Sequence, residues 1–343
     1  MRFLATVVFT CACAAAQDKP IPRVQAVPLP YHQVSFQYDE KELARYHFGP
    51  DLMRPFIFPV IGPSGRALTR MGHPGDPDTH SHHNSVWIGL SSVDGRDFWS
   101  DQGGRIRHLR TVHLEDGDRT AWAITEAEWI PHDGPAVLRE RRGVFVKLLT
   151  GGEWLLLLDL QLKPAGVKAV IDKASFGPIG VRVAKTIGAF HGGGRLRNSE
   201  GAAGEEQLFR RPARWVDYSG QVAAGVVEGL TLMDHPSNPR HPAPFHVRED
   251  GWMGAMLALE EPYEISAGKP LHLLYGIYVH TGLPAPTVID QVWQRFVTEP
   301  PIPPFGPPRT ERDCQHGEFR RYNVPRTFAS FADCVDFVKR AAR

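Results

Sequence analysis

Short apolar runs separated by turn residues extend along most of this chain, and that rhythm limits the folds open to it. Glycine and proline, 33 and 30 of the 343 residues, interrupt the apolar runs from Val24 onward. Because these two residues end strands and form turns, the pattern is typical of a β-sandwich or a β-barrel. The sequence therefore predicts an all-β, antiparallel protein and disfavours a helical bundle.

The clearest predicted hairpin lies near the middle of the chain. Residues 143–149 form one apolar arm, Thr150-Gly151-Gly152 supplies a tight turn, and residues 153–162 form the second arm. The leucines at 155–158 are apolar on both faces, which predicts a central strand. Further strands are predicted at residues 167–171, 180–184, 226–233 and 271–279.

Helix signals are nearly confined to the C-terminal end. In residues 286–296, four apolar side chains follow helical spacing, namely Ile289, Val292, Trp293 and Phe296. Thr287 is the predicted N-cap of this helix. A second amphipathic pattern in the tail follows Ser330 and includes Phe328, Phe331, Val335 and Val338. We expect this tail helix to be a short C-terminal appendage.

The N-terminus reads as an export signal. Arg2 precedes a stretch of apolar and small residues, and Ala14-Ala15-Ala16 offers a cleavage site before Gln17. We therefore expect a signal peptide over residues 1–16 and an exported protein, periplasmic or secreted. The alternative is a buried N-terminal strand. The mature chain would keep Cys314 and Cys334, which could form one disulfide in an oxidising compartment.

The rest of the chain divides into three predicted parts. Residues 17–298 form one β-sandwich domain, residues 299–308 form a stiff proline-rich linker, and residues 309–343 form a tail with a short helix. The formal net charge of +1 disfavours a nucleic-acid partner. No apolar run beyond the N-terminus reaches the roughly 20 residues that a transmembrane helix needs.

A histidine-rich loop is the densest cluster of reactive side chains. Residues 71–84 contain four histidines and two aspartates and lead into the apolar run at 86–90. In an extended backbone, His80 and His82 would share one face and His83 the other. Neutral imidazoles could bind a divalent metal at His80 and His82, or act as general acid and base at His82 and His83. The alternative is an exposed loop whose histidines only form hydrogen bonds.

A second polar cluster spans residues 234–248. Prolines stiffen this segment and present Asp234, a candidate catalytic residue, with four candidate substrate-binding residues: His235, Asn238, His246 and Arg248. A rigid surface turn with solvated charges is the alternative. Of the isolated histidines, we favour His191 over His280 as a catalytic residue, because the glycines at 192–194 would let a ligand approach the backbone.

Aromatic residues near these loops suggest a sugar ligand. Trp87 and Trp99 could stack on the apolar C–H face of a sugar ring, although most tryptophans are expected in the core. Asp97 and Arg182 could hold sugar hydroxyls, and Asp217 could orient or protonate. No nucleophile elbow, phosphate-binding loop, zinc-protease motif or convincing dinucleotide fingerprint is present.

Ordered blocks between residues 28 and 298 resemble the bacterial PmoA-like family, a domain of unknown function labelled "methane oxygenase PmoA". The matching blocks are residues 54–60, 73–87, 93–99, 180–184, 215–220 and 234–239. This resemblance implies an exported β-sandwich protein linked with polysaccharide use, of the jelly-roll or galactose-mutarotase-like supersandwich type. The family's loop commonly reads His-Pro-His-His-Arg-Gly, whereas Ser81, Asn84 and Ser85 replace residues of that pattern here.

Three functions remain open from the sequence. The first is a carbohydrate-active hydrolase or lyase that uses the histidines and aspartates as acid and base in a tryptophan-lined cleft. The second is a non-catalytic periplasmic module that binds a sugar or a metal. The third is a metal-dependent oxygenase, which rests on the family label and the histidines. This function fits poorly, because the subunits of membrane-bound methane monooxygenase cross the membrane several times and this chain has no spanning segment.

Overall fold

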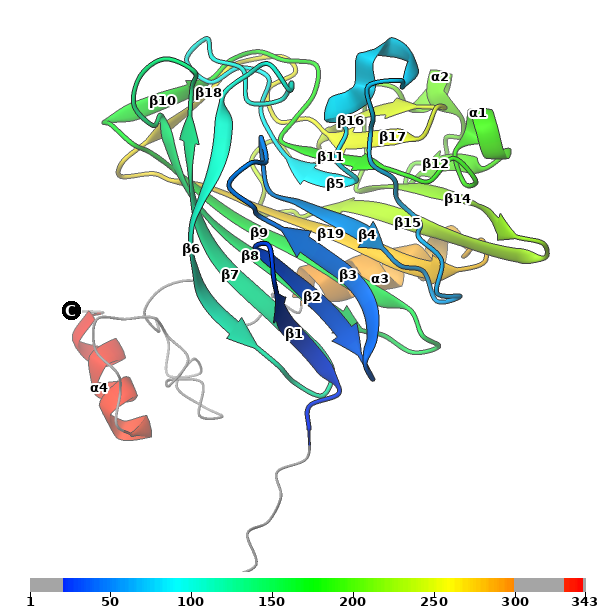
Figure 1. The fold of residues 1–343 in the computed structure, drawn as a ribbon, viewed down its shortest axis with the longest axis horizontal. Coiled ribbons are helices and arrows are strands. Elements are labelled where there is room, and N and C mark those ends of the chain that lie inside the picture. The colour runs from blue at the N-terminus through cyan, green and yellow to red at the C-terminus, as the bar shows by residue number, and fades with distance from the viewer. Residues whose placement is uncertain (1–20, 299–329, 342–343) are drawn as a thin grey trace, which may run out of the picture.

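A computed structural model describes residues 21–298 and 330–341, and the first of these ranges forms two large antiparallel sheets packed face to face (Figure 1). One sheet has nine strands, in the spatial order β1 (Val24–Leu29), β2 (Gln33–Tyr38), β3 (Lys41–His47), β4 (Phe56–Val60), β5 (Val86–Ile88), β11 (Ile179–Arg182), β17 (Trp252–Ala255), β16 (Pro244–Arg248) and β13 (Arg211–Pro212).

The other large sheet has eight strands, and a small sheet has two. The eight are, in order, β12 (Arg195–Asn198), β14 (Trp215–Ala223), β15 (Val226–Asp234), β19 (Leu271–Thr281), β9 (Trp154–Pro164), β8 (Leu138–Leu148), β7 (Thr120–Ile130) and β6 (Arg105–Glu115). The small sheet pairs β10 (Lys168–Ile171) with β18 (Tyr263–Ser266). The antiparallel β-sandwich expected from the sequence is therefore confirmed.

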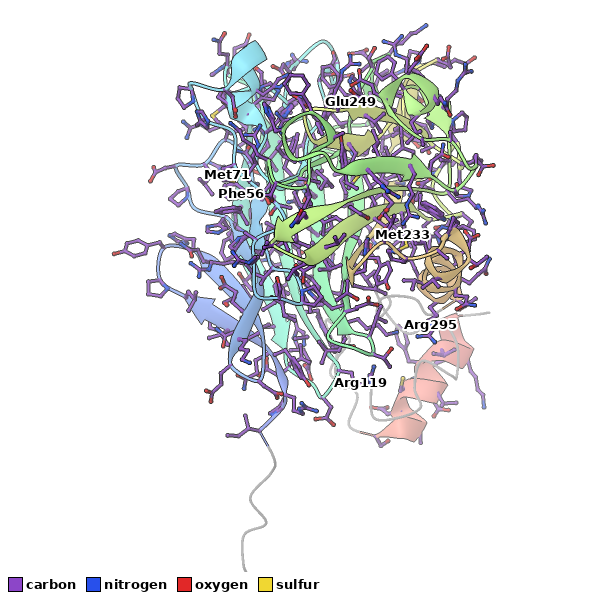
Figure 2. All side chains as sticks on the ribbon, turned by 90° about the vertical axis from the view of Figure 1, so that its right-hand side faces the viewer. Phe56, Met71, Arg119, Met233, Glu249 and Arg295 are labelled. Atoms are coloured by element: carbon purple, nitrogen blue, oxygen red, sulfur yellow. The ribbon has the colours of Figure 1, made fainter. Side chains whose placement is uncertain are left out.

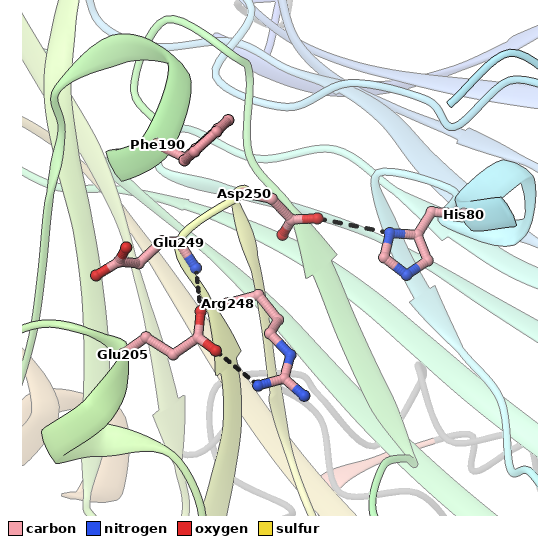
Figure 3. Close-up of a pocket in the computed structure, with 6 residues that line it drawn as sticks. All are labelled: His80, Phe190, Glu205, Arg248, Glu249 and Asp250. Atoms are coloured by element: carbon pink, nitrogen blue, oxygen red, sulfur yellow. Dashed lines mark hydrogen bonds and ion pairs between the residues drawn. The ribbon is translucent and has the colours of Figure 1, made fainter. Parts of the chain in front are cut away.

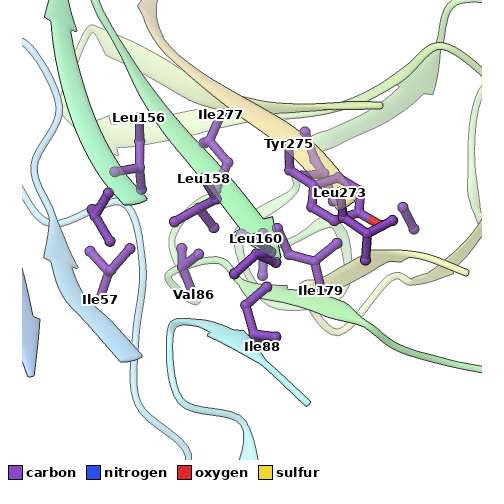
Figure 4. Close-up of a cluster of buried hydrophobic side chains, with 14 of the residues drawn as sticks. Ile57, Val86, Ile88, Leu156, Leu158, Leu160, Ile179, Leu273, Tyr275 and Ile277 are labelled. Carbon is purple, nitrogen blue, oxygen red and sulfur yellow. The ribbon is translucent and has the colours of Figure 1, made fainter. Parts of the chain in front are cut away.

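The core lies between the two large sheets. Strand β9 contributes Leu156, Leu158 and Leu160 to it, and these meet side chains of the nine-stranded sheet such as Val86 and Ile179 (Figure 4). The alternate leucines of β9, Leu155 and Leu157, point to the opposite face of the sheet, where they belong to a second apolar cluster. The run of leucines is thus buried on both sides, as its composition predicts.

Helix α3 (Pro286–Thr298) covers this second face of the eight-stranded sheet. In the side view of Figure 2, Met233 of β15 lies beside α3, whereas Phe56 and Met71 lie at the other side of the molecule. The helix buries the four predicted apolar residues, Ile289, Val292, Trp293 and Phe296. The predicted N-cap Thr287 is wrong, because the backbone N–H groups of Val288 and Ile289 donate to the carbonyl of Ala285, and Pro286 occupies the first turn.

The predicted hairpin is confirmed as β8 paired with β9, and β9 is central, between β8 and β19. The other predicted strands correspond to β10, β11, β15 and β19. The remaining helices of the described chain are α1 (Ala189–Gly192), α2 (Glu205–Leu208), a 3-10 helix at Pro77–His82 and the tail helix α4 (Phe331–Ala341). Within the described ranges, no helix is both long and apolar enough to cross a membrane.

The tail helix begins where the sequence predicts. The side-chain oxygen of Ser330 accepts a hydrogen bond from the backbone N–H of Asp333 at 3.2 Å, a helix cap. Cys334 is disulfide-bonded. Several predictions fall outside the described residues, namely the signal peptide at 1–16, the linker at 299–308, Cys314 and Phe328.

The packing of α3 generates a stability prediction. Trp293→Ala should lower the free energy of unfolding by about 3–5 kcal/mol, because it removes a buried indole from the helix–sheet contact. The matched control Val288→Ala, on the same helix but 40% exposed, should change it by no more than about 0.5 kcal/mol. Denaturant unfolding of both variants measures this. Equal effects at the two positions would contradict the assignment of α3 as an essential cover of the sheet.

Candidate functional site

Strict alternation of side chains gives the nine-stranded sheet an outer face with its own chemistry. In β5, β11, β16 and β17, every second residue enters the core, including Val86, Val181, Val247 and Met253. The residues between them point outward because successive side chains of a strand face opposite sides. The outward residues include Trp87, Gly180, Arg182, His246, Arg248 and Trp252.

An aromatic floor lies on this outer face. Trp87, Trp99 and Trp252 are all buried in one cluster with Phe56, and Phe176 packs against it. Gly180 pairs with Trp87 across the strands β11 and β5, and a Cβ atom at this position would overlap the indole. The glycine therefore lets the Trp87 ring lie close over the neighbouring strand.

The histidine-rich loop sits on this floor, but its shape differs from the prediction. Residues Pro77–His82 form a 3-10 helix instead of an extended segment. As a result His80 and His83 face each other, with ring centroids 4.3 Å apart and planes at 14°. The ring of His83 also stacks on Trp87, at 5.0 Å and 25°, and only 2% of His83 is exposed.

Arg54, which the sequence analysis did not assign to the site, fixes this loop. Its guanidinium is 1% exposed and donates to the Asn84 side-chain oxygen at 2.7 Å, to the His82 carbonyl at 3.3 Å and to the Ser100 carbonyl at 2.5 Å. Ser81 adds a hydrogen bond to Asp101 at 2.8 Å. One buried cation thus ties the histidine loop to the segment that carries Trp99.

Two adjoining pockets open at this place. The first, which we name the aromatic pocket, has a volume of about 280 Å³ and is lined by His80, His82, His83, Trp99, Phe176, His246, Arg248 and Trp252. The second, the acidic pocket, has a volume of about 530 Å³ and is lined by His80, Phe190, Glu205, Arg248, Glu249 and Asp250 (Figure 3). His80 and Arg248 line both, so they stand at the boundary between the two.

An imidazole–carboxylate pair lies at that boundary. His80 Nδ1 is 3.5 Å from Asp250 Oδ2 (Figure 3). The other oxygen of Asp250 accepts a hydrogen bond from Arg182 at 2.7 Å. Burial alone would raise the pKa of Asp250, but His80 and Arg182 together hold that pKa well below its usual range. Asp250 is therefore a carboxylate that can orient His80 and stabilise its charged form.

Arg248 is held by a different carboxylate. Its guanidinium donates to Glu205 Oε1 at 2.6 Å, and the second oxygen of Glu205 accepts the backbone N–H of Glu249 at 2.7 Å (Figure 3). The guanidinium also lies over the Phe209 ring, 4.3 Å from its centroid. These contacts fix the position of Arg248 while 39% of its side chain stays exposed.

Three histidines of the aromatic pocket are neutral at neutral pH. Burial lowers the pKa of His246 to about 4; the hydrogen bond to the Ser175 carbonyl opposes this shift, and the positive charges of Arg248 and Arg210 add to it. Burial likewise lowers the pKa of His82, with Arg54 adding to the shift, and holds that of His83 well below its usual range. Neutral imidazoles can accept as well as donate hydrogen bonds.

The pocket also contains polar atoms that the protein leaves unpaired. His246 Nδ1 lies 2.7 Å from the Ser175 carbonyl and must donate to it, so a neutral ring has its acceptor at Nε2. Within the described chain, the lining residues have four buried atoms without a hydrogen-bond partner: His80 Nδ1, which lies 3.5 Å from Asp250, His83 Nδ1, His246 Nε2 and Trp252 Nε1. Buried polar atoms are normally paired, so this arrangement suits a small ligand that has both hydroxyl groups and apolar faces.

The structure brings together about half of the predicted site residues. His82, His83, Trp99, His246 and Arg248 line the aromatic pocket, together with His80. Two other candidates lie directly beneath it: Trp87 supports the His83 ring, and Arg182 donates to Asp250 while its charge also acts on His83. The sequence analysis missed Asp250, Glu205, Phe176 and Trp252.

His191 does not belong to this group. It lines a separate, shallow hollow of about 490 Å³ with Lys185, Thr186 and Gln221. The glycines that favoured it have another purpose, because a Cβ atom at Gly192 would collide with the Thr186 carbonyl and one at Gly194 with the Ile187 carbonyl. The two glycines therefore permit close packing of the backbone. Because His191 lines a different hollow, the expectation that it meets His82 and His83 is wrong.

Asp217 and Asp234 are also remote from the pockets. Asp217 is fully buried in the eight-stranded sheet, where His280 at 2.9 Å and Arg197 at 2.9 Å overcome the effect of burial and lower the pKa of Asp217 to about 2. Asp234 accepts hydrogen bonds from Asn238 and the Ala243 backbone N–H at the end of β15, and its carbonyl accepts one from Trp293 of α3. Both aspartates therefore have structural roles, since their carboxylates pair with neighbouring elements of the fold.

Three predicted binding residues have structural partners instead. Asn238 forms two hydrogen bonds with the backbone of Leu274, and the ring of His235 packs edge-on against Phe296. Asp97 accepts the backbone N–H groups of Trp99 and Ser100 and so shapes the turn below the pocket. None of the three lines the aromatic or the acidic pocket.

The metal site predicted at His80 and His82 finds no support in the geometry. The two rings lie edge to face with centroids 6.1 Å apart. Among the side chains that the structure describes, no three His, Cys, Asp or Glu residues gather closely enough to hold an ion.

Comparisons with known proteins give a family and distant structural likenesses. Residues 33–294 match a family of unknown function, DUF6807. No curated protein matches the chain in sequence.

Similar solved structures include a polysaccharide lyase, with 9% identity over 77% of this chain and 33% of that one, at a TM-score of 0.29. A provisionally assigned aldose 1-epimerase from Escherichia coli K12 has 11% identity over 70% of this chain and 97% of that one, at a TM-score of 0.28. A provisionally assigned kojibiose phosphorylase from the human microbiome has 5% identity over 81% of this chain and 36% of that one, at a TM-score of 0.31. The chain spans about a third of the length of the lyase and of the phosphorylase.

The neutral histidines generate a pH prediction. The pKa of His246 is lower in the folded protein, about 4, than in the unfolded chain, 6.5. Between these values the unfolded chain binds a proton that the folded protein does not, so stability falls as the pH falls. Between pH 6.5 and pH 4, the free energy of unfolding should fall less steeply with falling pH in His246→Gln than in wild type. The difference between the two slopes should be about 1.4 kcal/mol per pH unit. Denaturant unfolding across this range measures it, and identical slopes would contradict a neutral His246.

Proposed function

We propose that this chain, which belongs to the DUF6807 family of unknown function, is a carbohydrate-active enzyme that cleaves a glycosidic bond, a hydrolase or a lyase. The observation that carries the proposal is the aromatic pocket with its unpaired polar atoms, His83 Nδ1, His246 Nε2 and Trp252 Nε1. A sugar ring has C–H faces that pack on indole and phenyl rings, and hydroxyl groups that both donate and accept hydrogen bonds. It therefore matches both features of the pocket.

The proposed acid is His80. Its Nδ1 faces Asp250, so the carboxylate would hold the ring in one orientation and stabilise the imidazolium, as in other carboxylate–imidazole pairs. His80 Nε2 would then exchange a proton with the oxygen of the glycosidic bond. Arg182 keeps Asp250 ionised and acts as a positioning residue.

The proposed base is His246, whose Nε2 accepts a proton because Nδ1 is committed to the Ser175 carbonyl. In a hydrolysis, the water oxygen bonds to the anomeric carbon, its proton passes to His246, the carbon–oxygen bond breaks and the leaving oxygen takes the proton of His80. In an elimination, which needs a carbon next to a carboxylate or carbonyl group of the inner unit, His246 removes the proton from that carbon and the C–H electrons form a double bond. The adjacent carbon–oxygen bond breaks, and the linking oxygen takes the proton of His80. Both routes balance without a metal or a redox cofactor.

A binding module for sugars is the competing function, because the same pocket would capture a sugar without turning it over. The paired His80 and Asp250 favour catalysis, since binding a neutral sugar requires no oriented imidazole. The finer likeness to the PmoA-like proteins stays a prediction, and an oxygenase would need a metal site that the described side chains do not form.

Export is part of the proposal as well. The signal peptide expected at residues 1–16 would deliver the enzyme to the periplasm or the medium, where polysaccharide fragments occur. The mature protein would then begin at Gln17, which N-terminal sequencing of the exported chain can determine.

His80→Gln should lower the rate of glycosidic cleavage by about 10²–10⁴-fold, because it removes the proposed proton donor without emptying a core position. Product chromatography with a panel of oligosaccharides measures the rate, and thermal unfolding checks the fold. The matched control His113→Gln, on β6 of the eight-stranded sheet and outside both pockets, should retain the wild-type rate. His83→Ala is a poor substitute, because it removes a buried ring stacked on Trp87.

An unchanged rate in His80→Gln would refute the assigned mechanism. Tight binding of oligosaccharides by the wild-type protein, measured by isothermal titration calorimetry and without product after long incubation, would establish the binding module instead.

A further inference from the structure

We infer that the site accepts an oligosaccharide of at least two sugar units, one in each pocket, with Phe190 as the stacking platform of the outer unit. This inference rests on the proposed function and adds the substrate's length and the charge of its outer unit. It is carried by four properties of the acidic pocket, namely its size, its shared wall, its exposed ring and its charge.

The size of the pockets argues for more than one sugar. The aromatic pocket, about 280 Å³, lies just below the range of about 300–1,000 Å³ that holds drug-sized ligands. It therefore has room for a single sugar ring. The acidic pocket adds about 530 Å³ directly beside it, which a monosaccharide in the first pocket would leave to solvent.

The shared wall places the bond between the two units at the reactive group. His80 and Arg248 line both pockets, so a chain that occupies both must pass them. His80 is the proposed acid, and the atom that it would protonate is the oxygen that links two sugar rings. The geometry of the two pockets and the proposed chemistry thus select the same linkage.

Phe190 supplies the outer platform. It lies on the short helix α1, lines the acidic pocket and is 74% exposed, which is costly for a phenyl ring in water (Figure 3). Its position is fixed, because its backbone N–H donates to the Glu249 carbonyl at 2.8 Å, next to Asp250. The ring also contacts His191 edge to face, with centroids 4.9 Å apart. A sugar in the acidic pocket would cover this ring.

Charge decides which kind of sugar fits there. Three carboxylates line the acidic pocket, Glu205, Glu249 and Asp250, whereas only Arg248 lines it with a guanidinium and Arg182 reaches it through Asp250. Glu205 is paired with Arg248, and Asp250 with Arg182 and His80, whereas the Glu249 carboxylate forms no ion pair within the described chain. A uronate would add another negative charge, while the carboxylates accept hydrogen bonds from the hydroxyls of a neutral sugar. The outer unit is therefore a neutral sugar.

The test compares Phe190→Ala with the wild-type protein. The probes are neutral methyl glycosides and neutral oligosaccharides of two to four units, built from glucose, galactose, mannose or xylose, with uronate oligosaccharides of the same lengths. Isothermal titration calorimetry measures affinity. We expect wild type to bind a neutral oligosaccharide more tightly than its monosaccharide, and Phe190→Ala to weaken oligosaccharide binding by about three- to tenfold while leaving monosaccharide binding unchanged. Tyr31→Ala removes another exposed aromatic, 86% exposed and outside both pockets, and should change neither affinity.

The outcomes separate this inference from the proposed function. Cleavage of long substrates with the same KM in Phe190→Ala and wild type would overturn the inference and leave the enzyme intact. Weaker oligosaccharide binding in Phe190→Ala, without product from any protein, would support the two-unit site and refute catalysis. Equal affinity of wild type for monosaccharide and oligosaccharide, or a preference for uronates, would overturn the inference directly.

Discussion

The alternation of side chains in four short strands is the constraint on which the rest of the site depends. In β5, β11, β16 and β17 one face closes the sandwich core, and the other forms the floor and wall of the aromatic pocket. A shift of one residue in any of these strands would exchange the two faces. The register is fixed by the core between the sheets, because one face of each strand is buried there, and the geometry of the site depends on that register. Gly180 shows how close the fit is, since a Cβ atom at this position would overlap the Trp87 ring.

The polar groups of the site are arranged at some cost to stability. His83 and His246 are buried as neutral rings with an unpaired nitrogen each, and buried unpaired groups oppose folding. Two buried arginines fix the elements around these rings: Arg54 ties the histidine loop to the Trp99 segment, and Arg182 holds Asp250. Such polar groups, oriented but unsatisfied by the protein, are what a ligand with many hydroxyls requires.

The sequence predicts the sandwich, and a cluster of histidines beside tryptophans, because both depend on local patterns; it does not predict the 3-10 shape of the histidine loop. The leucines of β9 and the apolar spacing of α3 are visible in the chain, and His82, His83 and Trp99 occur near one another in it. Asp250 and Phe176 could not be found in this way, because long-range strand pairing brings them to the loop. Alternation in the β16–β17 hairpin offered one missed signal: applied to residues 245–255, it groups His246 and Arg248 with Trp252. His191 shows the opposite error, since its glycines serve backbone packing.

A crystal structure of the protein with a bound neutral oligosaccharide tests the central claim most directly. The predicted result is a sugar ring in the aromatic pocket, with a hydroxyl group within hydrogen-bond distance of His246 Nε2 and the next ring crossing His80 toward Phe190. Density for the sugar in the hollow beside His191, with no sugar between Trp252 and His80, would contradict it.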